Sequence, residues 1–306
     1  MGTPDFAVTI LDKILNQNYN VVGVITAPDK QAGRGRKIQQ SAVKKYAVEK
    51  GLNILQPTNL KSTDFQETLE NLKPNLQIVV AFRMLPRSVW SLPEFGTFNL
   101  HASLLPHYRG AAPINWAIIN GETETGTSTF FLDDKIDTGE IILQNKTEIT
   151  PNETVGELHD RLMHLGSNLV IETLELIEAD NVTTTKQAAN SNKLAYKIHT
   201  DTCKINWNQP SQKIYNHIRG LNPYPAAWTT LNNNEEEIIV KIFDSEIILE
   251  IHNHQPGKII TDKKSIKIAT IDGFIKVNKL KLAGKKLMDS SSLLNGYVFK
   301  DTAYMS

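Results

Sequence analysis

Two side chains in one short segment could act together in catalysis. Asn99 and His101 lie two positions apart in an alternating run that begins at Phe98, and side chains two apart on a strand point to the same face. An amide that donates hydrogen bonds to a developing oxyanion would therefore lie beside an imidazole that acts as a general base. The run continues into a turn that ends at Pro106, so both side chains are expected to enter one cleft.

An acidic residue completes this candidate site. Asp137 follows His101 by thirty-six residues, in the turn sequence Ile136-Asp137-Thr138-Gly139. A buried carboxylate beside an imidazole selects its tautomer and supports its action as a base. Taken singly, the three residues have ordinary explanations: a turn aspartate, a satisfied histidine and an asparagine bonded to its own backbone. Together they lack a serine or cysteine nucleophile, which suits group transfer to a nucleophile that the substrate supplies.

The elements that must position these residues alternate along the first half of the chain. Hydrophobic periodicity and turn residues predict helices that begin after Thr3 and Ser62 and that span 41–50, 112–120 and 154–178. Strands are predicted over 20–26, 52–55, 76–82, 127–132 and 140–143. Strands separated by helices in this way indicate an α/β, Rossmann-like domain with a mostly parallel sheet, over residues 1–178.

The start of the chain departs from this pattern. A doubly wound sheet normally opens with a strand that becomes central, yet Met1-Gly2-Thr3-Pro4 already has the character of a helix N-terminus. Loss of a central strand would leave two unpaired ladders in the core. We therefore expect the first strand to be absent from this sequence and a short apolar strand to lie upstream of Met1.

The second half of the chain predicts a different architecture. Residues 179–201 are polar and read as a linker, and residues 202–306 hold short alternating strands with turn residues between them. A small OB-like β-barrel is predicted there. From Gln255 to Lys300 there are ten lysines and three acidic residues. Such a segment favours a polyanion such as a nucleic acid, or forms a lysine-rich solvated surface, and the composition alone does not choose between them.

Composition excludes several classes of protein. The 306 residues are 40% hydrophobic, which is ordinary for a soluble globular protein and excludes collagenous and disordered chains. No apolar run approaches the roughly 18 residues of a membrane span. Cys203 is the single cysteine, so no internal disulfide forms. We expect no membrane association and a cytoplasmic location.

The histidines outside the candidate site do not indicate a metal centre. His159 and His164 are five apart on a predicted helix and do not share a face as an i, i+4 pair would. His252 and His254 could share a strand face, but no cysteine or paired acid lies near them in the sequence. No metal is expected.

The string FNLHASLLPHYRGAAPINWAIINGE, followed by IDTG, resembles the catalytic core of the formyltransferases that use N10-formyltetrahydrofolate. The resemblance implies that Asn99, His101 and Asp137 are the catalytic residues and that the folate is a cosubstrate. It also implies that the folate is contacted by Ser103, Leu104, Leu105 and Pro106, with Phe82 and Met84 in the same region. Arg83 departs from the family, which commonly has a glycine there; it could bond the pterin or the glutamate tail, or turn to solvent.

Three further segments resemble the methionyl-tRNA formyltransferases within this family: GTPDFA, the loop from Pro28 to Lys37, and the stretch from Tyr196 to Pro225. They imply an initiator methionyl-tRNA as partner and formyl transfer to its α-amino group for translation initiation. Nothing in the sequence demands more than one chain, and a monomer is expected. The candidate tRNA contacts are Arg34, Arg36 and Lys37 in the loop and Lys263, Lys264, Lys281, Lys285 and Lys286 in the barrel.

Two other readings remain open from the residues alone. One is a formyltransferase that acts on an amino-sugar nucleotide or another small amine, and it would have little use for a lysine-rich barrel. The other is a non-catalytic nucleic-acid-binding protein on a decayed core, against which the intact Asn99, His101 and Asp137 argue. The AGRGRK segment in the basic loop can also be read as a flexible surface loop, because it lacks the third glycine of a dinucleotide site.

Overall fold

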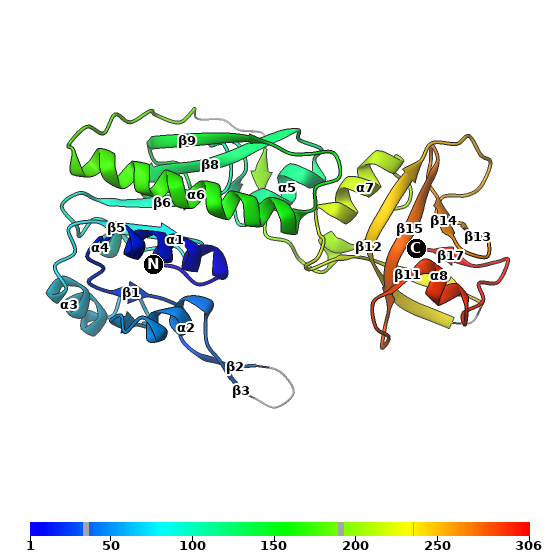
Figure 1. The fold of residues 1–306 in the computed structure, drawn as a ribbon, viewed down its shortest axis with the longest axis horizontal. Coiled ribbons are helices and arrows are strands. Elements are labelled where there is room, and N and C mark those ends of the chain that lie inside the picture. The colour runs from blue at the N-terminus through cyan, green and yellow to red at the C-terminus, as the bar shows by residue number, and fades with distance from the viewer. Residues whose placement is uncertain (33–36, 189–192, 235) are drawn as a thin grey trace. The chain divides into compact units, whose positions relative to one another are not determined.

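A computed structural model describes the whole chain apart from residues 33–36, 189–192 and 235 and the side chains of residues 32 and 37 (Figure 1). The chain forms two compact units. The first unit comprises Met1–Gly110, Thr125–Thr147 and Asp160–Leu194, and the second comprises Ala111–Glu124, Glu148–His159 and Ala195–Ser306. Each unit is therefore assembled from segments that are distant in the sequence.

The first unit alternates short strands and helices, as the periodicity predicted. Its helices are α1 (Asp5–Asn16), α2 (Ala42–Glu49), α3 (Thr63–Asn71), α4 (Arg87–Trp90) and most of α6 (Val155–Glu178). Its strands are β1 (Val24–Ile25), β2 (Lys30–Ala32), β3 (Lys37–Gln39), β4 (Ile54–Leu55), β5 (Gln77–Val80), β6 (Thr97–His101), β7 (Arg109–Gly110), β8 (Glu124–Phe131) and β9 (Ile141–Glu148).

Helix starts follow local capping chemistry in one case and depart from it in another. The Ser41 hydroxyl accepts a hydrogen bond from the Lys44 N–H at 3.0 Å and so caps α2. Thr3 was expected to cap α1, but Pro4 occupies the N-cap position. Pro4 has an extended backbone, with ψ of 177°, so the helix begins one residue later than the sequence suggested.

Besides the β2–β3 hairpin and the short strand β7, the strands of the first unit form two sheets. β1 pairs with β4 in parallel, and the other sheet has the order β5-β6-β8-β9. β5 and β6 are parallel, whereas β8 runs antiparallel to β6. The parallel prediction therefore holds for β1, β4, β5 and β6, and β8 makes the sheet mixed. The fold is the predicted α/β, Rossmann-like arrangement.

Residues Met1 and Gly2 lie between the two sheets, where a central strand was expected. Gly2 donates a backbone hydrogen bond to Ile25 at 3.0 Å, and Val80 donates one to Met1 at 2.9 Å. The Met1 ammonium donates to the Ile78 carbonyl at 2.6 Å, and burial lowers the pKa of this amine to about 5. These two residues join β1 to β5.

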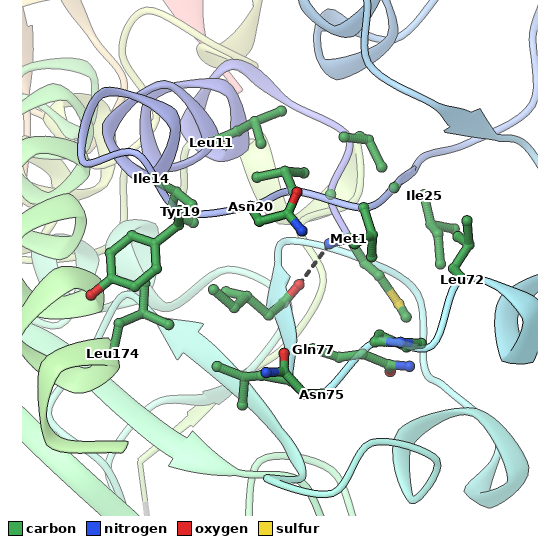
Figure 2. Close-up of a pocket in the computed structure, with 18 of the residues that line it drawn as sticks. Met1, Leu11, Ile14, Tyr19, Asn20, Ile25, Leu72, Asn75, Gln77 and Leu174 are labelled. Atoms are coloured by element: carbon green, nitrogen blue, oxygen red, sulfur yellow. Dashed lines mark hydrogen bonds between the residues drawn. The ribbon is translucent and has the colours of Figure 1, made fainter. Parts of the chain in front are cut away.

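A cavity of about 490 Å³ lies beside Met1 (Figure 2). Leu11 and Ile14 of α1 line it together with Leu174 of α6. Residues of β1 and β5 complete the lining. The cavity therefore lies along the edges of β1 and β5, next to the residues that Met1 and Gly2 bond.

The core of the first unit supports β6 from both sides of the strand. Phe98 is fully buried, and so is Phe130, the residue that pairs with Asn99 in the β6–β8 register. Helix α6 packs closely over the sheet (Figure 1). A Cβ atom at Gly166 of α6 would lie 2.8 Å from a methyl of Leu100, so glycine lets the helix approach the strand closely without moving that side chain. β6 is thereby held in the middle of the unit.

The second unit contains a nearly closed antiparallel barrel. Its sheet has the order β13-β14-β15-β12-β11-β17, with β16 beside β15. The Lys258–Tyr304 bridge links the β13 and β17 edges. The strands are β11 (Ala227–Asn233), β12 (Glu236–Ile248), β13 (Ile259–Thr261), β14 (Ile266–Ala269), β15 (Phe274–Leu282), β16 (Met288–Asp289) and β17 (Tyr304–Met305), and the helices are α5 (Pro113–Ile119), α7 (Ser211–Arg219) and α8 (Ser290–Leu294).

The barrel confirms the predicted fold of this region, with one difference in its strands. Short strands were predicted in this region, whereas β12 runs for 13 residues, and its pairing with β15 shifts register at Asp244. A β-bulge lets one strand bend and remain paired on both sides of the bend. Leu231, Ile242, Ile266 and Ile275 are fully buried and belong to one core cluster.

Part of the range predicted to be a linker packs on the first unit. Thr185 and Ile141 of β9 exchange two backbone hydrogen bonds of 2.8 Å each. The neighbouring β10 (Leu194–Ala195) is paired with β7. None of the helices in the described ranges has both the length and the apolar character needed to span a bilayer.

Replacing Phe130 with alanine should destabilise the protein by about 3–5 kcal/mol, because the truncation leaves a cavity in the core cluster that Phe130 forms with Leu105 and Ile141. Phe95, which is 45% exposed, provides the matched control, and Phe95→Ala should cost less than about 1 kcal/mol. Urea unfolding of both variants measures the free energies. Equal losses would contradict the placement of Phe130 in the core.

Candidate active site

The strand β6 presents Asn99 and His101 on one face. Asn99 is half-buried, whereas His101 is 7% exposed. Asn99 pairs with Val79 of β5 and with Phe130 of β8, so β6 has a neighbour on each side. A strand fixed on both edges holds its side chains in nearly constant positions. The alternation read from the sequence therefore corresponds to the observed geometry.

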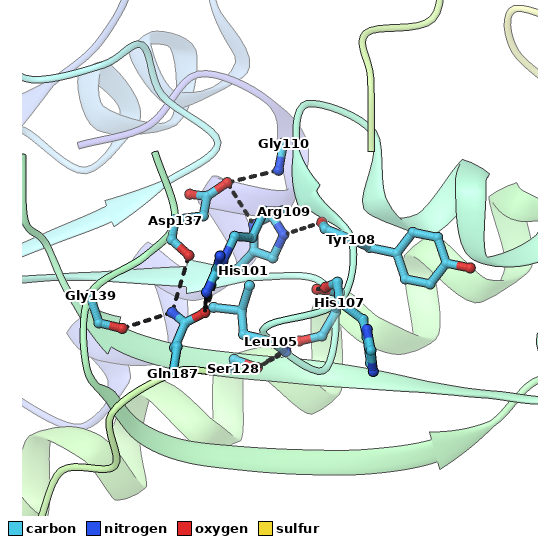
Figure 3. A network of polar contacts seen from close by, with 11 residues as sticks. His101, Leu105, His107, Tyr108, Arg109, Gly110, Ser128, Asp137, Gly139 and Gln187 are labelled. Atoms are coloured by element: carbon cyan, nitrogen blue, oxygen red, sulfur yellow. Dashed lines mark hydrogen bonds and ion pairs between the residues drawn. The ribbon is translucent and has the colours of Figure 1, made fainter. Parts of the chain in front are cut away.

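The His101 ring is oriented by a backbone carbonyl. Its Nε2 lies 2.8 Å from the Tyr108 carbonyl oxygen (Figure 3). A carbonyl can only accept a hydrogen bond, so Nε2 carries the proton in the neutral ring. Tyr108 is buried and has φ of 59°, in the left-handed region, which turns its carbonyl back toward β6. The tautomer is thus set by Tyr108, where the sequence had suggested Asp137.

Asp137 approaches the other ring nitrogen. Its Oδ2 lies 3.9 Å from His101 Nδ1, a distance too long for a direct hydrogen bond but short enough for an ion pair. The same oxygen accepts the Gly110 N–H at 2.9 Å. Asp137 has φ of 53°, and a Cβ at Gly139 would lie 1.6 Å from the Phe131 carbonyl. This turn therefore needs both the left-handed aspartate and the glycine.

A glutamine from a distant segment braces this turn. Gln187 Nε2 donates to the Asp137 carbonyl at 3.1 Å and to the Gly139 carbonyl at 2.7 Å. Its Oε1 accepts hydrogen bonds from Arg109 Nε at 3.0 Å and Nη2 at 2.7 Å (Figure 3). Sequence reasoning missed Gln187 and Arg109 because no motif or fixed spacing connects residues seventy-eight positions apart.

The segment from Ser103 to Pro106 is held by a hydroxyl network. Ser128 Oγ donates to the Ser103 carbonyl at 2.6 Å and lies 3.2 Å from the Leu105 N–H. Gln144 Nε2 donates to the Leu105 carbonyl at 3.0 Å and to Ser128 Oγ at 2.7 Å. The Leu105–Pro106 peptide is cis. Polar contacts from β8 and β9 thereby hold the loop that follows β6.

The predicted folate-contacting residues differ in exposure. Leu105 packs in a core cluster with Phe130 and Ile141 and is 3% exposed. Ser103 is fully buried, and its hydroxyl donates to the His107 carbonyl at 2.7 Å. Leu104 and Pro106 are half-buried. A ligand at this loop would therefore meet Leu104 and Pro106, whereas Leu105 and Ser103 support the loop from beneath.

Arg83 is engaged with the backbone. Its Nη1 donates to the Thr58 carbonyl at 2.9 Å, and its Nη2 donates to the Pro57 carbonyl. Phe82 is half-buried and Met84 is 65% exposed. A cavity of about 450 Å³ at this place is lined by Thr3, Ala27, Pro28, Lys30, Thr58, Phe82 and Arg83. The guanidinium thus fixes the wall of this cavity.

The candidate tRNA contacts divide into two groups. Arg34 and Arg36 lie outside the described residues, as does the side chain of Lys37. The five barrel lysines are all exposed, at positions 263, 264, 281, 285 and 286. Lys281 of β15 pairs with Lys241 of β12, which brings a second positive charge beside it. Within the described ranges, no group of three or more His, Cys, Asp or Glu side chains could hold a metal ion.

Comparison with known proteins covers both units. Residues 1–174 match the family model described as formyl transferase, and residues 197–298 match that described as formyl transferase, C-terminal domain. A methionyl-tRNA formyltransferase of Flavobacterium johnsoniae is 59% identical over 304 residues, which cover 99% of this chain and 96% of that protein. One of Porphyromonas gingivalis is 46% identical over 312 residues, covering 100% and 97%.

Solved structures share the fold at lower identity. The sugar 3N-formyl transferase WlaRD, crystallised in the presence of dTDP and 5-N-formyl-THF, has a TM-score of 0.66 and 23% identity, covering 93% of this chain and 97% of that one. HypX from Aquifex aeolicus, in complex with tetrahydrofolic acid, has a TM-score of 0.58 and 20% identity, covering 81% of this chain and 43% of that one.

The Tyr108 contact predicts the tautomer of His101. In protein labelled with ¹⁵N on histidine, long-range ¹H–¹⁵N correlation should show neutral His101 with a protonated Nε2 and a bare Nδ1, because only Nε2–H can donate to a carbonyl. Assignment by the spectrum of His101→Gln identifies the signal. A neutral ring protonated on Nδ1 would contradict the observed orientation.

Proposed function

The chain belongs to the formyl transferase family and, within it, to the methionyl-tRNA formyltransferases, and on this premise we propose that it formylates initiator methionyl-tRNA for translation initiation. The formyl donor is N10-formyltetrahydrofolate, and the acceptor is the α-amino group of the methionyl ester. The proposal rests on sequence similarity to relatives of that name over nearly the full length of the chain. Asn99, His101 and Asp137, which lie at one site, support it. The reaction occurs in the cytosol, and a single chain supplies all the catalytic side chains.

The amine is the nucleophile and needs little activation. A free α-amino group has a pKa of about 7.7–8.0, and the neighbouring ester lowers it, so much of the amine is neutral near pH 7. Attack on the formyl carbon forms the new C–N bond and a tetrahedral oxyanion. His101 accepts the amine proton at Nδ1, because its Nε2 is already bonded to the Tyr108 carbonyl. Asp137, 3.9 Å from that Nδ1, stabilises the resulting imidazolium.

Stabilisation of the oxyanion is the main catalytic contribution. The Asn99 side-chain amide, on the same face of β6 as His101, donates to the developing negative charge. Collapse of the intermediate breaks the bond between the formyl carbon and N10, and the proton held by His101 passes to N10. The half-buried Leu104 and Pro106 of the loop after β6, with Phe82, offer an apolar surface to the pterin.

The barrel and the basic loop bind the tRNA. The five exposed lysines, with Lys241 paired beside Lys281, supply positive charge that neutralises phosphates. Arg34, Arg36 and Lys37 engage the acceptor end. Phosphate contacts of this kind position the nucleic acid without reading its sequence.

Removing the oxyanion donor should slow turnover sharply. Asn99→Ala is expected to cost about 2.7–4 kcal/mol of transition-state stabilisation, which is roughly 10²–10³-fold in kcat, and His101→Ala should lose at least as much. Asn71→Ala, at an exposed position at the end of α3, is the matched control with unchanged turnover. Near wild-type kcat in Asn99→Ala or His101→Ala would refute these roles.

The acceptor is identified by a competition among three amines. With N10-formyltetrahydrofolate as donor, charged initiator tRNA should acquire formate, whereas free methionine and an amino-sugar nucleotide should not. Formylation of the sugar alone would instead establish the small-amine reaction. The measurement is transfer of a ¹⁴C-formyl label to each acceptor.

Salt dependence tests the lysine surface separately. The double variant Lys285→Gln/Lys286→Gln should raise KM for tRNA and reduce the slope of log(kcat/KM) against log salt by about 2, because each phosphate contact contributes about 0.9 to it. KM for the folate should stay unchanged and serves as the internal control. A slope identical to that of the wild type would show that these lysines do not contact phosphate.

A further inference from the structure

Gln187 belongs to a short segment that crosses the back of the Asp137 turn. Thr185, two residues earlier, is paired with Ile141 by two backbone hydrogen bonds, and the Ala188 carbonyl accepts a hydrogen bond from Arg109 Nη2 at 3.2 Å. Lys186 and Gln187 lie between these two anchors. Lys186 is exposed and Gln187 is half-buried. Its side chain is therefore held in place from both sides.

The side-chain amide of Gln187 uses its full hydrogen-bonding capacity. Both Nε2 hydrogens meet carbonyl oxygens, those of Asp137 and Gly139, while Oε1 faces two N–H groups of the Arg109 guanidinium. The opposite amide orientation would place NH₂ against the guanidinium and oxygen against two carbonyls. The surrounding groups thus determine one orientation of this side chain.

Gln187 connects the two groups that determine where the Asp137 carboxylate lies. It binds the main chain of Asp137 itself, in a turn with a left-handed φ. It also binds Arg109, the residue before Gly110, whose N–H donates to Asp137 Oδ2 at 2.9 Å (Figure 3). The oxygen held in this way is the one that lies 3.9 Å from His101 Nδ1.

We propose that Gln187 is a positioning residue for formyl transfer, which acts by holding the Asp137 carboxylate against His101. The proposal rests on the function proposed above. It follows from the geometry because Gln187 does not touch His101 through any of its four hydrogen bonds, and all four end on the Asp137 turn or on Arg109. A displacement of about 1 Å in a catalytic group can cost on the order of 100-fold in rate.

Two substitutions distinguish the hydrogen bonds of Gln187 to Arg109 from those to the Asp137 turn. Gln187→Ala removes all four hydrogen bonds and should lower kcat by about 10- to 100-fold, with KM for folate and tRNA unchanged. Gln187→Glu keeps an acceptor for Arg109 but loses both donors to the turn, so it should lose as much. Lys186→Ala, at an exposed position on the same segment, is the matched control with unchanged kcat. Full activity in Gln187→Glu would overturn the proposal.

A double-mutant cycle shows whether Gln187 acts through Asp137. In an Asp137→Asn background, Gln187→Glu should have little further effect on kcat, because the carboxylate that it positions is already lost. Losses that multiply would show that Gln187 acts independently of Asp137 and would refute the proposal. The wild-type rate is measured first. If the wild type transfers no formyl group to tRNA, the proposed function fails. If the wild type is active and Gln187→Glu keeps full activity, only the role of Gln187 is refuted.

Discussion

The hydrogen bond between His101 Nε2 and the Tyr108 carbonyl ties the strand β6 to the loop that follows it. It fixes the ring orientation and the tautomer, and it leaves Nδ1 without a proton in the neutral ring. Tyr108 can reach back because its backbone adopts a left-handed φ and its ring is buried. The next two residues, Arg109 and Gly110, are then in place to hold the Asp137 turn. The arrangement of the active site therefore depends on the loop after β6, which folds back so that the Tyr108 carbonyl reaches the His101 ring.

Rigidity at this site comes from packing beneath it and polar contacts around it. Phe98 of β6 and Phe130 of β8 are fully buried, and Gly166 lets α6 approach Leu100 closely. Ser128 and Gln144 hold the Ser103–Pro106 loop through hydroxyl and amide hydrogen bonds. A catalytic group is positioned well only where its supporting shell is itself fixed. The same core that stabilises the unit thus also sets the catalytic geometry.

The two units suit different ligands. The first unit holds the amide, imidazole and carboxylate that suit formyl transfer, and the half-buried Leu104 and Pro106 that suit a folate. The barrel of the second unit buries its apolar residues inside and exposes lysines on its strands and turns. Small-molecule chemistry depends on a few side chains placed within fractions of an ångström, whereas binding to phosphates depends on charge density.

The sequence by itself indicated the alternation of helices and strands in the first unit, the barrel in the second and the placement of Asn99 and His101 on one face of a strand, because periods of 2 and 3.6 residues are local properties. It also indicated Asp137, through a motif. Only the tertiary structure decided that Tyr108 sets the tautomer, that Leu105 belongs to the core, that Arg83 binds backbone carbonyls and that Gln187 braces the Asp137 turn. These contacts join residues from separate segments or depend on left-handed backbone angles, and neither leaves a periodic signal in the chain.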